Sequence, residues 1–253
     1  MNKQSNSYII IYATVLVVLV AAVLAFTAIK LQPLQQANVA IEKMGSILSS
    51  IGKGQEAATA PEGKEAYTTA QYEKYIVDSY LVNDQGESAQ GSTPEKTFAA
   101  LDDLPAAYAS PANERALPVF ESRDHDGTVR YIIPITGKGL WGPVWGYIAL
   151  DADMNTIYGA RFDHAGETPG LGAEIALPVF GDQFIKKTIF EDDKFVSVAL
   201  TKGAGSSVGN PHAVDAISGG TLTSNGVGAM IKDCLKEYVP FFNKKRAEKG
   251  GAQ

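Results

Sequence analysis

The chain has 253 residues, 45% hydrophobic and 20% charged, a composition typical of globular proteins. Its formal net charge of −6 argues against a nucleic-acid-binding function, because such proteins need a basic surface to displace counterions. The single cysteine, Cys234, excludes an internal disulfide framework and a cysteine-built metal site.

The first predicted element is a membrane anchor. Residues 7–29 contain no charged side chain and would form about 35 Å of helix, enough to cross a bilayer. A cleaved signal peptide is the alternative, but the apolar run is too long for one and lacks a good cleavage position. We therefore expect an uncleaved anchor. Its orientation is weakly marked, because Lys3 precedes the span while Lys30 and Lys43 follow it.

A helix with a single apolar stripe is predicted after the anchor. Steps of three and four residues separate its apolar positions, which are Leu34, Ala37, Ile41, Met44, Leu48 and Ile51. Residues 54–71 are typical of a loop or linker. Residues 84–112 are typical of a long connecting segment with one short helix. This organisation predicts an anchor over residues 1–30, a membrane-proximal helix and linker over 31–60, and the main domain over 61–253.

From residue 128 onward the hydrophobic pattern has a period of two. It predicts strands over residues 128–136, 144–150, 156–164 and 194–202. Short strands joined by tight turns indicate an antiparallel sheet. Helices predicted over residues 178–187 and 226–238 complete an α+β domain.

Two glycine-rich loops are candidates for the wall of a ligand site. "GKGLWGPVWG" (137–146) is equally well explained as a hairpin with buried aromatic residues. In "HAGETPGLGAE" (164–174), Gly170 and Gly172 indicate a sharp bend or the close approach of a flat ligand. His164 and Glu167 lack helical spacing and an evident third ligand, so no metal site is expected.

Fingerprints of nucleotide binding and of nucleophilic catalysis are missing. In "LTKGAGSSVGN" (200–210) the third glycine comes too late for a dinucleotide fingerprint, and Asn210-Pro211 follows where a helix should begin. The sequence also has no P-loop and no nucleophile elbow. We therefore expect no catalytic residue in the strict sense.

The stretch "DAISGGTLTSNGVG" (215–228) gathers hydroxyls at the entrance of the predicted helix. Ser224 or Asn225 is the expected N-cap, which leaves Ser218, Thr221 and Thr223 near free backbone N–H groups, a natural seat for phosphate. The helix buries an apolar stripe that includes the cysteine, so a reactive thiol is not expected; its residues are Val227, Met230, Ile231, Cys234, Leu235 and Tyr238.

These segments together resemble a known family. "LQPLQQAN" after the anchor, "GKGLWGPVWGYIAL", "HAGETPGLGAE" and "DAISGGTLTSNGV" are similar to the C subunits of the sodium-translocating NADH:quinone reductases. The G subunits of the Rnf electron-transport complexes are more distant relatives, and "GKGLW" favours the quinone-reductase family. In this family the threonine of a Ser-Gly-Ala-Thr motif is joined to FMN by a phosphoester bond. Here the motif reads Ser218-Gly219-Gly220-Thr221.

The resemblance implies an FMN-binding domain on the periplasmic side of the bacterial inner membrane, held by a single-pass anchor. A flavin transferase that uses FAD would attach the FMN, with Asp215 as the acid of its recognition pattern. The domain would relay single electrons among the other subunits of a complex that oxidises NADH, reduces ubiquinone and exports Na⁺. The alternatives are a covalent flavoprotein of the Rnf type and an anchored non-redox flavin- or ligand-binding module.

The residues expected around the FMN come from both glycine-rich loops, the hydroxyl-rich stretch and one lysine. If the chain around Thr221 and Thr223 is extended, the two side chains face opposite ways, and the motif assigns the bond to Thr221. Thr223 and the helix N-terminus would then contact the phosphate. Lys202 continues one face of its predicted strand and is the candidate cation. The full set is Leu140, Trp141, Glu167, Thr168, Gly170, Leu171, Gly172, Lys202, Ser218, Gly219, Gly220, Thr221, Leu222 and Thr223.

Overall fold

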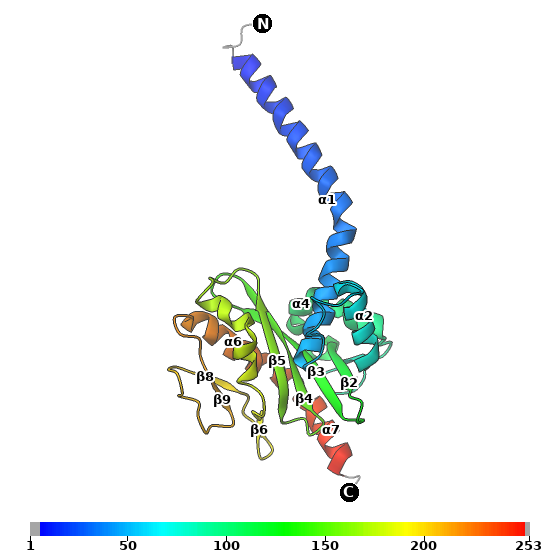
Figure 1. The fold of residues 1–253 in the computed structure, drawn as a ribbon, viewed down its shortest axis with the longest axis vertical. Helices are drawn as coiled ribbons and strands as arrows, with labels where there is room; N and C mark the ends of the chain where they lie inside the picture. Colours follow the sequence, from blue (N-terminus) through cyan, green and yellow to red (C-terminus); the bar gives the residue numbers. More distant parts are fainter. Residues whose placement is uncertain (1–5, 251–253) are drawn as a thin grey trace. The chain divides into compact units, whose positions relative to one another are not determined.

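The computed structural model describes residues 6–250; residues 1–5, which include Lys3, and residues 251–253 lie outside the described part. The chain divides into two compact units, Met1–Lys43 and Met44–Gln253. Figure 1 shows the elements in chain order.

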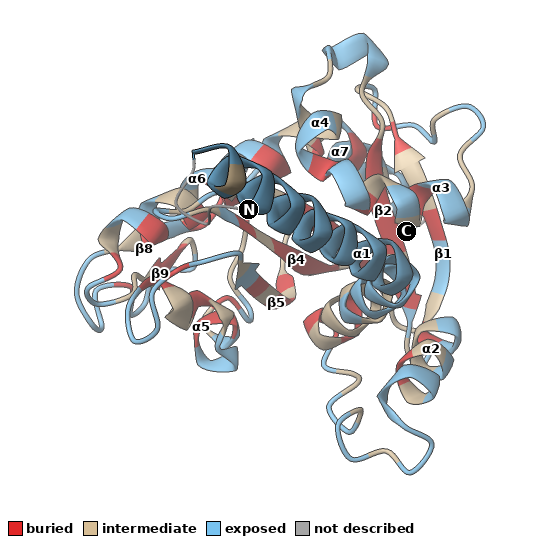
Figure 2. Cartoon of the chain, turned by 90° about the horizontal axis from the view of Figure 1, so that it is seen from above, coloured by how far each residue is buried: buried red, intermediate tan, exposed pale blue. Residues whose placement is uncertain are grey.

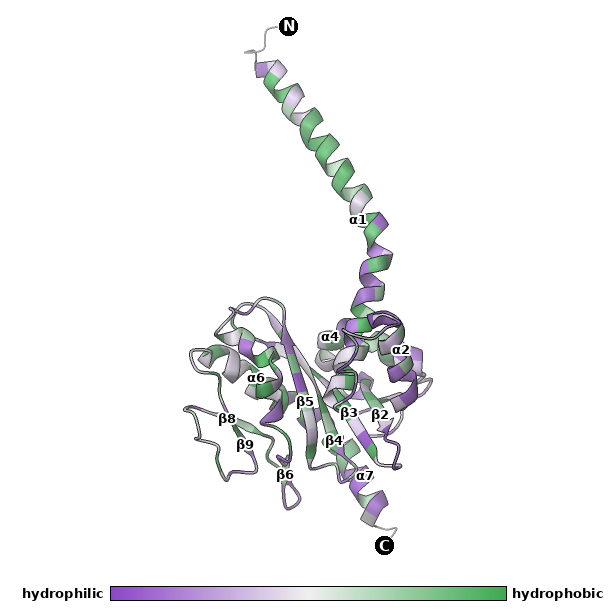
Figure 3. Cartoon of the chain, viewed as in Figure 1, coloured by the Kyte–Doolittle hydropathy of each residue, from purple (hydrophilic) through white to green (hydrophobic). Residues whose placement is uncertain are grey.

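The apolar stretch lies in helix α1 (Asn6–Ser50), which is long and apolar enough to cross a membrane. The hydrophobic stretch is predominantly green in Figure 3, and its residues have the colour of exposed residues in Figure 2. The sequence predicts the anchor and the amphipathic segment as separate elements, whereas the structure assigns one helix. Pro33 lies inside it, although a proline in a helix removes one backbone hydrogen bond.

The main sheet has five antiparallel strands, each paired with the next in chain order. Adjacent strands are joined over long registers, as in the pairing of β3 with β4 from Arg130↔Asp151 to Lys138↔Pro143. Three of the strands confirm the sequence-based prediction of an antiparallel sheet. The strands are β1 (Ile76–Val82), β2 (Leu117–Arg123), β3 (Val129–Lys138), β4 (Pro143–Asp151) and β5 (Ile157–His164).

Strands β1 and β2 were not predicted. A register shift between Ile76 and Asp78 breaks the period-two pattern of β1, which hides the strand from a periodicity argument. Helix α2 (Lys64–Tyr75) occupies part of the predicted linker. The predicted single short helix over residues 84–112 is wrong, because this stretch holds α3 (Pro94–Ala99), the 3₁₀ helix η1 (Ala100–Asp103), α4 (Leu104–Ala109) and the 3₁₀ helix η2 (Ala112–Glu114).

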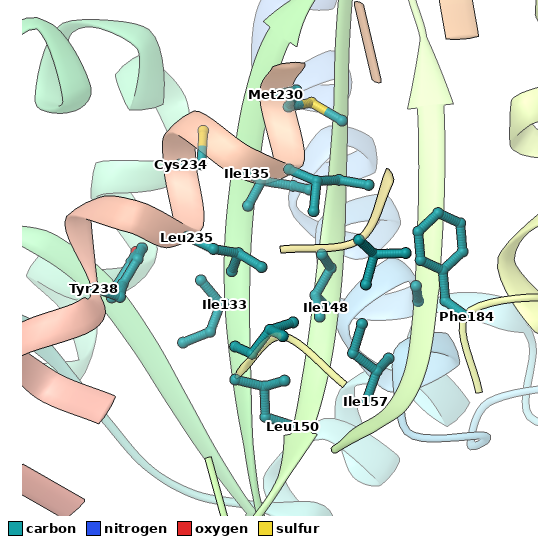
Figure 4. Packing of buried hydrophobic residues seen from close by; sticks show 14 of the residues in the cluster. Ile133, Ile135, Ile148, Leu150, Ile157, Phe184, Met230, Cys234, Leu235 and Tyr238 are labelled. Atoms are coloured by element: carbon teal, nitrogen blue, oxygen red, sulfur yellow. The ribbon is translucent and has the colours of Figure 1, made fainter. Parts of the chain in front are cut away.

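Both faces of the sheet are buried. On one face, Ile133 and Ile148 pack with Met230 and Leu235 of helix α6 (Thr221–Glu237), as Figure 4 shows. On the other face, Ile47, Leu48 and Ile51 from the end of α1 and the turn after it pack with Phe120, Ile132 and Tyr147. The central strands accordingly carry buried residues along their length (Figure 2).

The predicted strand over residues 194–202 is wrong. The structure has β7 (Lys194–Phe195), paired with β6 (Phe190–Glu191), and β8 (Ala199–Thr201), paired in parallel with β9 (Ala213–Asp215). Between β7 and β8, Ser197 has a φ of 66°, and the N–H groups of Val196 and Ser197 both donate to the carbonyl of Ile189. This bend ends the alternation that the sequence pattern suggested.

The helices after the sheet differ in length from their predictions. Helix α5 (Pro178–Asp182) ends before the predicted residue 187, and it follows the 3₁₀ helix η3 (Gly172–Ala176). Helix α6 begins at Thr221 rather than at residue 226. Helix α7 (Val239–Gly250), which was not predicted, follows it after the fully buried Tyr238, whose hydroxyl donates to the carbonyl oxygen of Pro118 (2.8 Å).

The loop after β1 approaches α7 closely at Gly86, and Gly127, in the turn between β2 and β3, offers a control with a similar φ but no such approach. Gly86 has a φ of 72°, and a Cβ atom there would overlap the backbone of Pro240 and Phe241. Gly127 has a φ of 82° but open space around it. Gly127→Ala should therefore lower the free energy of unfolding by about 1–2 kcal/mol, from backbone strain alone.

Gly86→Ala should lower it by about a further 1–3 kcal/mol, because the overlap forces the backbone apart. Urea unfolding of both full-length variants in detergent measures the difference. Equal losses in the two variants would contradict the close approach.

Candidate functional site

Three segments meet at the first turn of α6. They are the hairpin tip 139–142 between β3 and β4, the loop 164–172 after β5, and the stretch 217–223 that leads into the helix. The hairpin tip is closed by a hydrogen bond from the Gly139 N–H to the Gly142 carbonyl (2.8 Å). Hydrogen bonds to a buried carboxylate and close backbone packing hold the three segments against one another.

The carboxylate of Glu167 joins all three segments. Its Oε1 accepts a hydrogen bond from the backbone N–H of Trp141 in the hairpin tip (2.9 Å). Its Oε2 accepts a hydrogen bond from the hydroxyl of Thr223 in α6 (2.5 Å). The side chain is buried, with 5% of the residue exposed, so these bonds replace its contacts with water.

Two glycines make room for this carboxylate. A Cβ atom on Gly139 would overlap Glu167 Oε1, and one on Gly172 would overlap both Glu167 Oε2 and Thr223 Oγ1. The overlap at Gly172 explains why this predicted site residue is a glycine. Gly139 was missed, although its place in "GKGLWG" was the available signal.

Glu167 is held in its ionised form. Burial opposes ionisation, but the Thr223 hydroxyl, the backbone N–H groups of Trp141 and Leu140, and the nearby His164 together outweigh it, so the pKa of Glu167 is lowered. The backbone N–H of Glu167 itself donates to His164 Nδ1 (3.2 Å). Within residues 6–250, no group of three or more His, Cys, Asp or Glu residues is placed to hold a metal ion.

The first turn of α6 lacks a side-chain cap. The predicted N-cap at Ser224 or Asn225 is wrong: Gly220 is the N-cap and makes no side-chain hydrogen bond. Ser224 is instead the donor of the first helical bond, to the Gly220 carbonyl (2.8 Å), and its hydroxyl accepts the N–H of Ile217 (3.0 Å). The first backbone N–H groups of the helix are therefore left for water or an anion.

Thr221 and Thr223 lie on this first helical turn. The expectation of an extended chain is wrong, but two residues on a helix are about 200° apart, so the two side chains still point to different sides. Thr223 is buried, with its hydroxyl bonded to Glu167, whereas Thr221 is partly exposed.

The loop after β5 packs on the start of the helix. Gly219 has a φ of 75°, and a Cβ atom there would overlap the side chain of Leu171. A Cβ atom on Gly220 would lie 3.0 Å from Ile217 Cγ2 and 3.4 Å from the Cα atom of Gly172. An alanine at this position would fit if the Ile217 side chain shifted slightly.

Large apolar side chains are exposed on these same segments. The exposed fraction is 48% for Leu140, 67% for Trp141, 43% for Leu171 and 60% for Leu222. Thr168, Gly170 and Ser218 are exposed as well. Complete burial of one leucine-sized side chain contributes about 1.5–3 kcal/mol, so an apolar ligand that covered them would be stabilised.

Lys202 lies directly after β8. Because β8 and β9 are parallel and Thr201 pairs with Asp215, Lys202 has the same register position as Ala216, at the start of the hydroxyl-rich stretch. The residue is exposed. The strand face on which its position was predicted does not exist, because of the bend at Ser197.

A pocket that was not predicted from the sequence flanks α6. It has a volume of about 330 Å³ and lies between residues 196–200 and the helix face that includes Asn225, Gly228 and Lys232. The bend at Ser197 forms one of its walls, and such a bend leaves no periodic signal in the sequence.

Comparisons with known proteins agree with this geometry. Residues 139–236 match the FMN-binding domain family. The chain is 30% identical, over 97% of its length and 95% of the relative, to the C subunit of the Na(+)-translocating NADH-quinone reductase of Yersinia pestis. It is 31% identical to the corresponding protein of Neisseria meningitidis serogroup B, over 100% of this chain and 98% of the relative.

Solved structures show the same similarity. The crystal structure of the Na(+)-translocating NADH-quinone reductase C subunit from Parabacteroides distasonis has a TM-score of 0.71 and 42% identity, covering 84% of this chain and 96% of that one. NqrC of Shewanella oneidensis has a TM-score of 0.65 and 28% identity, covering 82% and 98%. With its apolar N-terminal helix, its antiparallel sheet and its FMN-binding domain, the chain belongs to the NqrC family, the C subunits of the Na⁺-translocating NADH-quinone reductases.

Proposed function

We propose that this chain is the subunit of a Na⁺-translocating NADH-quinone reductase that carries FMN in a phosphoester bond to Thr221 and relays single electrons to other subunits. The observation that supports this most is the position of Thr221. It is the partly exposed first residue of a helix with no side-chain cap, within the stretch that matches the FMN-binding domain.

The residues around Thr221 suit the phosphate end of FMN. A phosphoester on the first residue of α6 would lie beside backbone N–H groups that have no intrahelical partner, at the positive end of the helix dipole. Lys202, at the register position of Ala216, is the candidate for a further positive charge. The positive end of the helix dipole and the lysine charge would both favour a bound phosphate, which is negatively charged.

The exposed apolar side chains suit the ring end of FMN. Leu140 and Trp141 on the hairpin tip, with Leu171 and Leu222, offer apolar surface on the segments that adjoin Thr221. The ring supplies one-electron chemistry when FMN is bound, while the protein holds it and excludes side reactions. Gly170, which is exposed and has open space where a Cβ atom would lie, leaves this part of the loop free of a side chain that would obstruct the ring.

Attachment of the FMN requires a flavin transferase and FAD. The transfer forms a bond between the FMN phosphorus and Thr221 Oγ1, breaks the pyrophosphate bond of FAD, and releases AMP and the hydroxyl proton. Neighbouring hydroxyls are less suitable acceptors, because those of Thr223 and Ser224 are buried and engaged in hydrogen bonds. Ser218 is exposed but precedes the two glycines and lies outside the helix.

The acceptor threonine can be identified with two substitutions. Thr221→Ala, co-expressed with a flavin transferase, should abolish flavin fluorescence of the denatured band on a gel, because the hydroxyl that we propose as the acceptor is gone. Thr223→Ala should keep most of the fluorescence. Fragmentation of the flavin-bearing peptide from the unsubstituted protein should place the added mass on Thr221.

Mass on Thr223 would reverse the assignment. An unsubstituted chain that stays colourless in a host with an active transferase would favour the non-redox binding module instead.

We further propose that the domain lies on the periplasmic side of the inner membrane, anchored by α1. The native Cys234 is buried, so a single engineered surface cysteine can report the side. Lys64→Cys, on the exposed start of α2, should react with a membrane-impermeant maleimide in cells whose outer membrane has been permeabilised. Protection in intact inner membranes, lost after their disruption, would place the domain in the cytoplasm.

A further inference from the structure

We propose that Glu167 is a positioning residue of the flavin site: its carboxylate fixes the hairpin tip that carries Leu140 and Trp141 relative to the helix turn that carries Thr221. This inference rests on the proposed function of Thr221 as the flavin-bearing residue. It assigns Glu167 a role through its neighbours rather than through contact with the ring.

The two oxygens of the carboxylate divide between the two segments. Oε1 accepts from the backbone N–H of Trp141, and Oε2 from the hydroxyl of Thr223. Both acceptors are thus in use, and 5% of the residue is exposed, which leaves little surface for a ligand. Glu167 is therefore a buried group that holds neighbouring segments and is little available to a ligand.

The hydrogen bonds of Glu167 are made to a backbone N–H group and to the buried hydroxyl of a helical threonine, neither of which is at the end of a mobile side chain. The bond to the Trp141 N–H fixes the chain between Leu140 and Gly142 in the hairpin tip. The bond from Thr223 fixes the first turn of α6, two residues beyond Thr221. Among the side-chain hydrogen bonds found within residues 6–250, those of Glu167 are the ones that connect these two segments.

The glycines around the carboxylate indicate that the arrangement is specific. Side chains at Gly139 and Gly172 would each overlap an oxygen of Glu167. A mobile surface carboxylate would need no such space on two sides. With these two hydrogen bonds formed, a flavin bonded to Thr221 would meet an apolar wall in one fixed place; without them, the tip and the ring could move independently.

The test separates attachment of the flavin from the ordering of its ring. Full-length protein is co-expressed with a flavin transferase, and attachment is measured by the flavin fluorescence of the denatured band and by intact mass. Ring ordering is measured by the visible circular dichroism of the bound flavin and by quenching of its fluorescence with iodide.

Glu167→Ala should retain covalent FMN, because Thr221 is unchanged. Its visible circular dichroism should be largely lost, and its iodide quenching constant should rise several-fold. Glu167→Gln should stay close to the unsubstituted protein, because the amide can accept from the Trp141 N–H and donate to Thr223 Oγ1. This rescue is expected of a positioning role and not of a role that requires the charge.

Glu174→Ala is the matched control. Glu174 is in the 3₁₀ helix that follows the same loop, and its side chain accepts a hydrogen bond from the N–H of Gly170 (3.1 Å), which does not join the two segments. Its dichroism and quenching should equal those of the unsubstituted protein. An equal loss in both alanine variants would overturn the proposal, since any carboxylate near the loop would then matter.

A second variant keeps the proposal testable if Glu167→Ala does not fold. Thr223→Val removes one of the two bonds while preserving shape, and it should show an intermediate rise in iodide quenching. Values equal to the unsubstituted protein in Thr223→Val and Glu167→Ala, or loss of ordering in Glu167→Gln, would overturn the positioning role. A lack of covalent FMN in the unsubstituted protein would instead refute the proposed function of Thr221.

Discussion

A buried carboxylate is the constraint on which the geometry of the site depends. Moving an ionised carboxyl group out of water is unfavourable by several kcal/mol unless hydrogen bonds replace the lost hydration. For Glu167 the replacements come from Trp141 and Thr223, which belong to different parts of the chain. Satisfying this one group therefore requires the hairpin tip, the loop after β5 and the start of α6 to meet, and the glycines at 139 and 172 are a consequence of that requirement.

Helix α6 connects this site to the hydrophobic core. Met230, Cys234 and Leu235 lie in the core against the sheet, while the first turn of the same helix carries Thr221 at the surface. Burial raises the pKa of the Cys234 thiol to about 11, so this cysteine serves packing rather than reactivity. Because the helix is fixed by the core, its N-terminus is held in place, as the proposed attachment of FMN to Thr221 requires.

The site keeps features that destabilise a protein without its ligand. The first turn of α6 has no side-chain cap, and Trp141 and Leu222 expose more than half of their surface. A capping side chain and buried apolar residues would each contribute about 1 kcal/mol or more. An uncapped helix and exposed apolar side chains are expected at functional sites, where a ligand supplies the missing contacts.

The apolar anchor, the antiparallel strands β3 to β5, the burial of Cys234 and the stretch that resembles a flavin-attachment motif could be predicted from sequence, because periodicity and motif spacing are local properties. The other features depend on contacts that appear only in the folded chain. At the start of α6 the Ser224 hydroxyl accepts the Ile217 N–H, and at the bend the N–H groups of Val196 and Ser197 donate to the Ile189 carbonyl; neither contact repeats along the chain as a periodic pattern would. The pairing of Glu167 with Trp141 and Thr223 joins residues 26 and 56 positions apart, and such long-range hydrogen bonds leave no periodic trace in a single sequence.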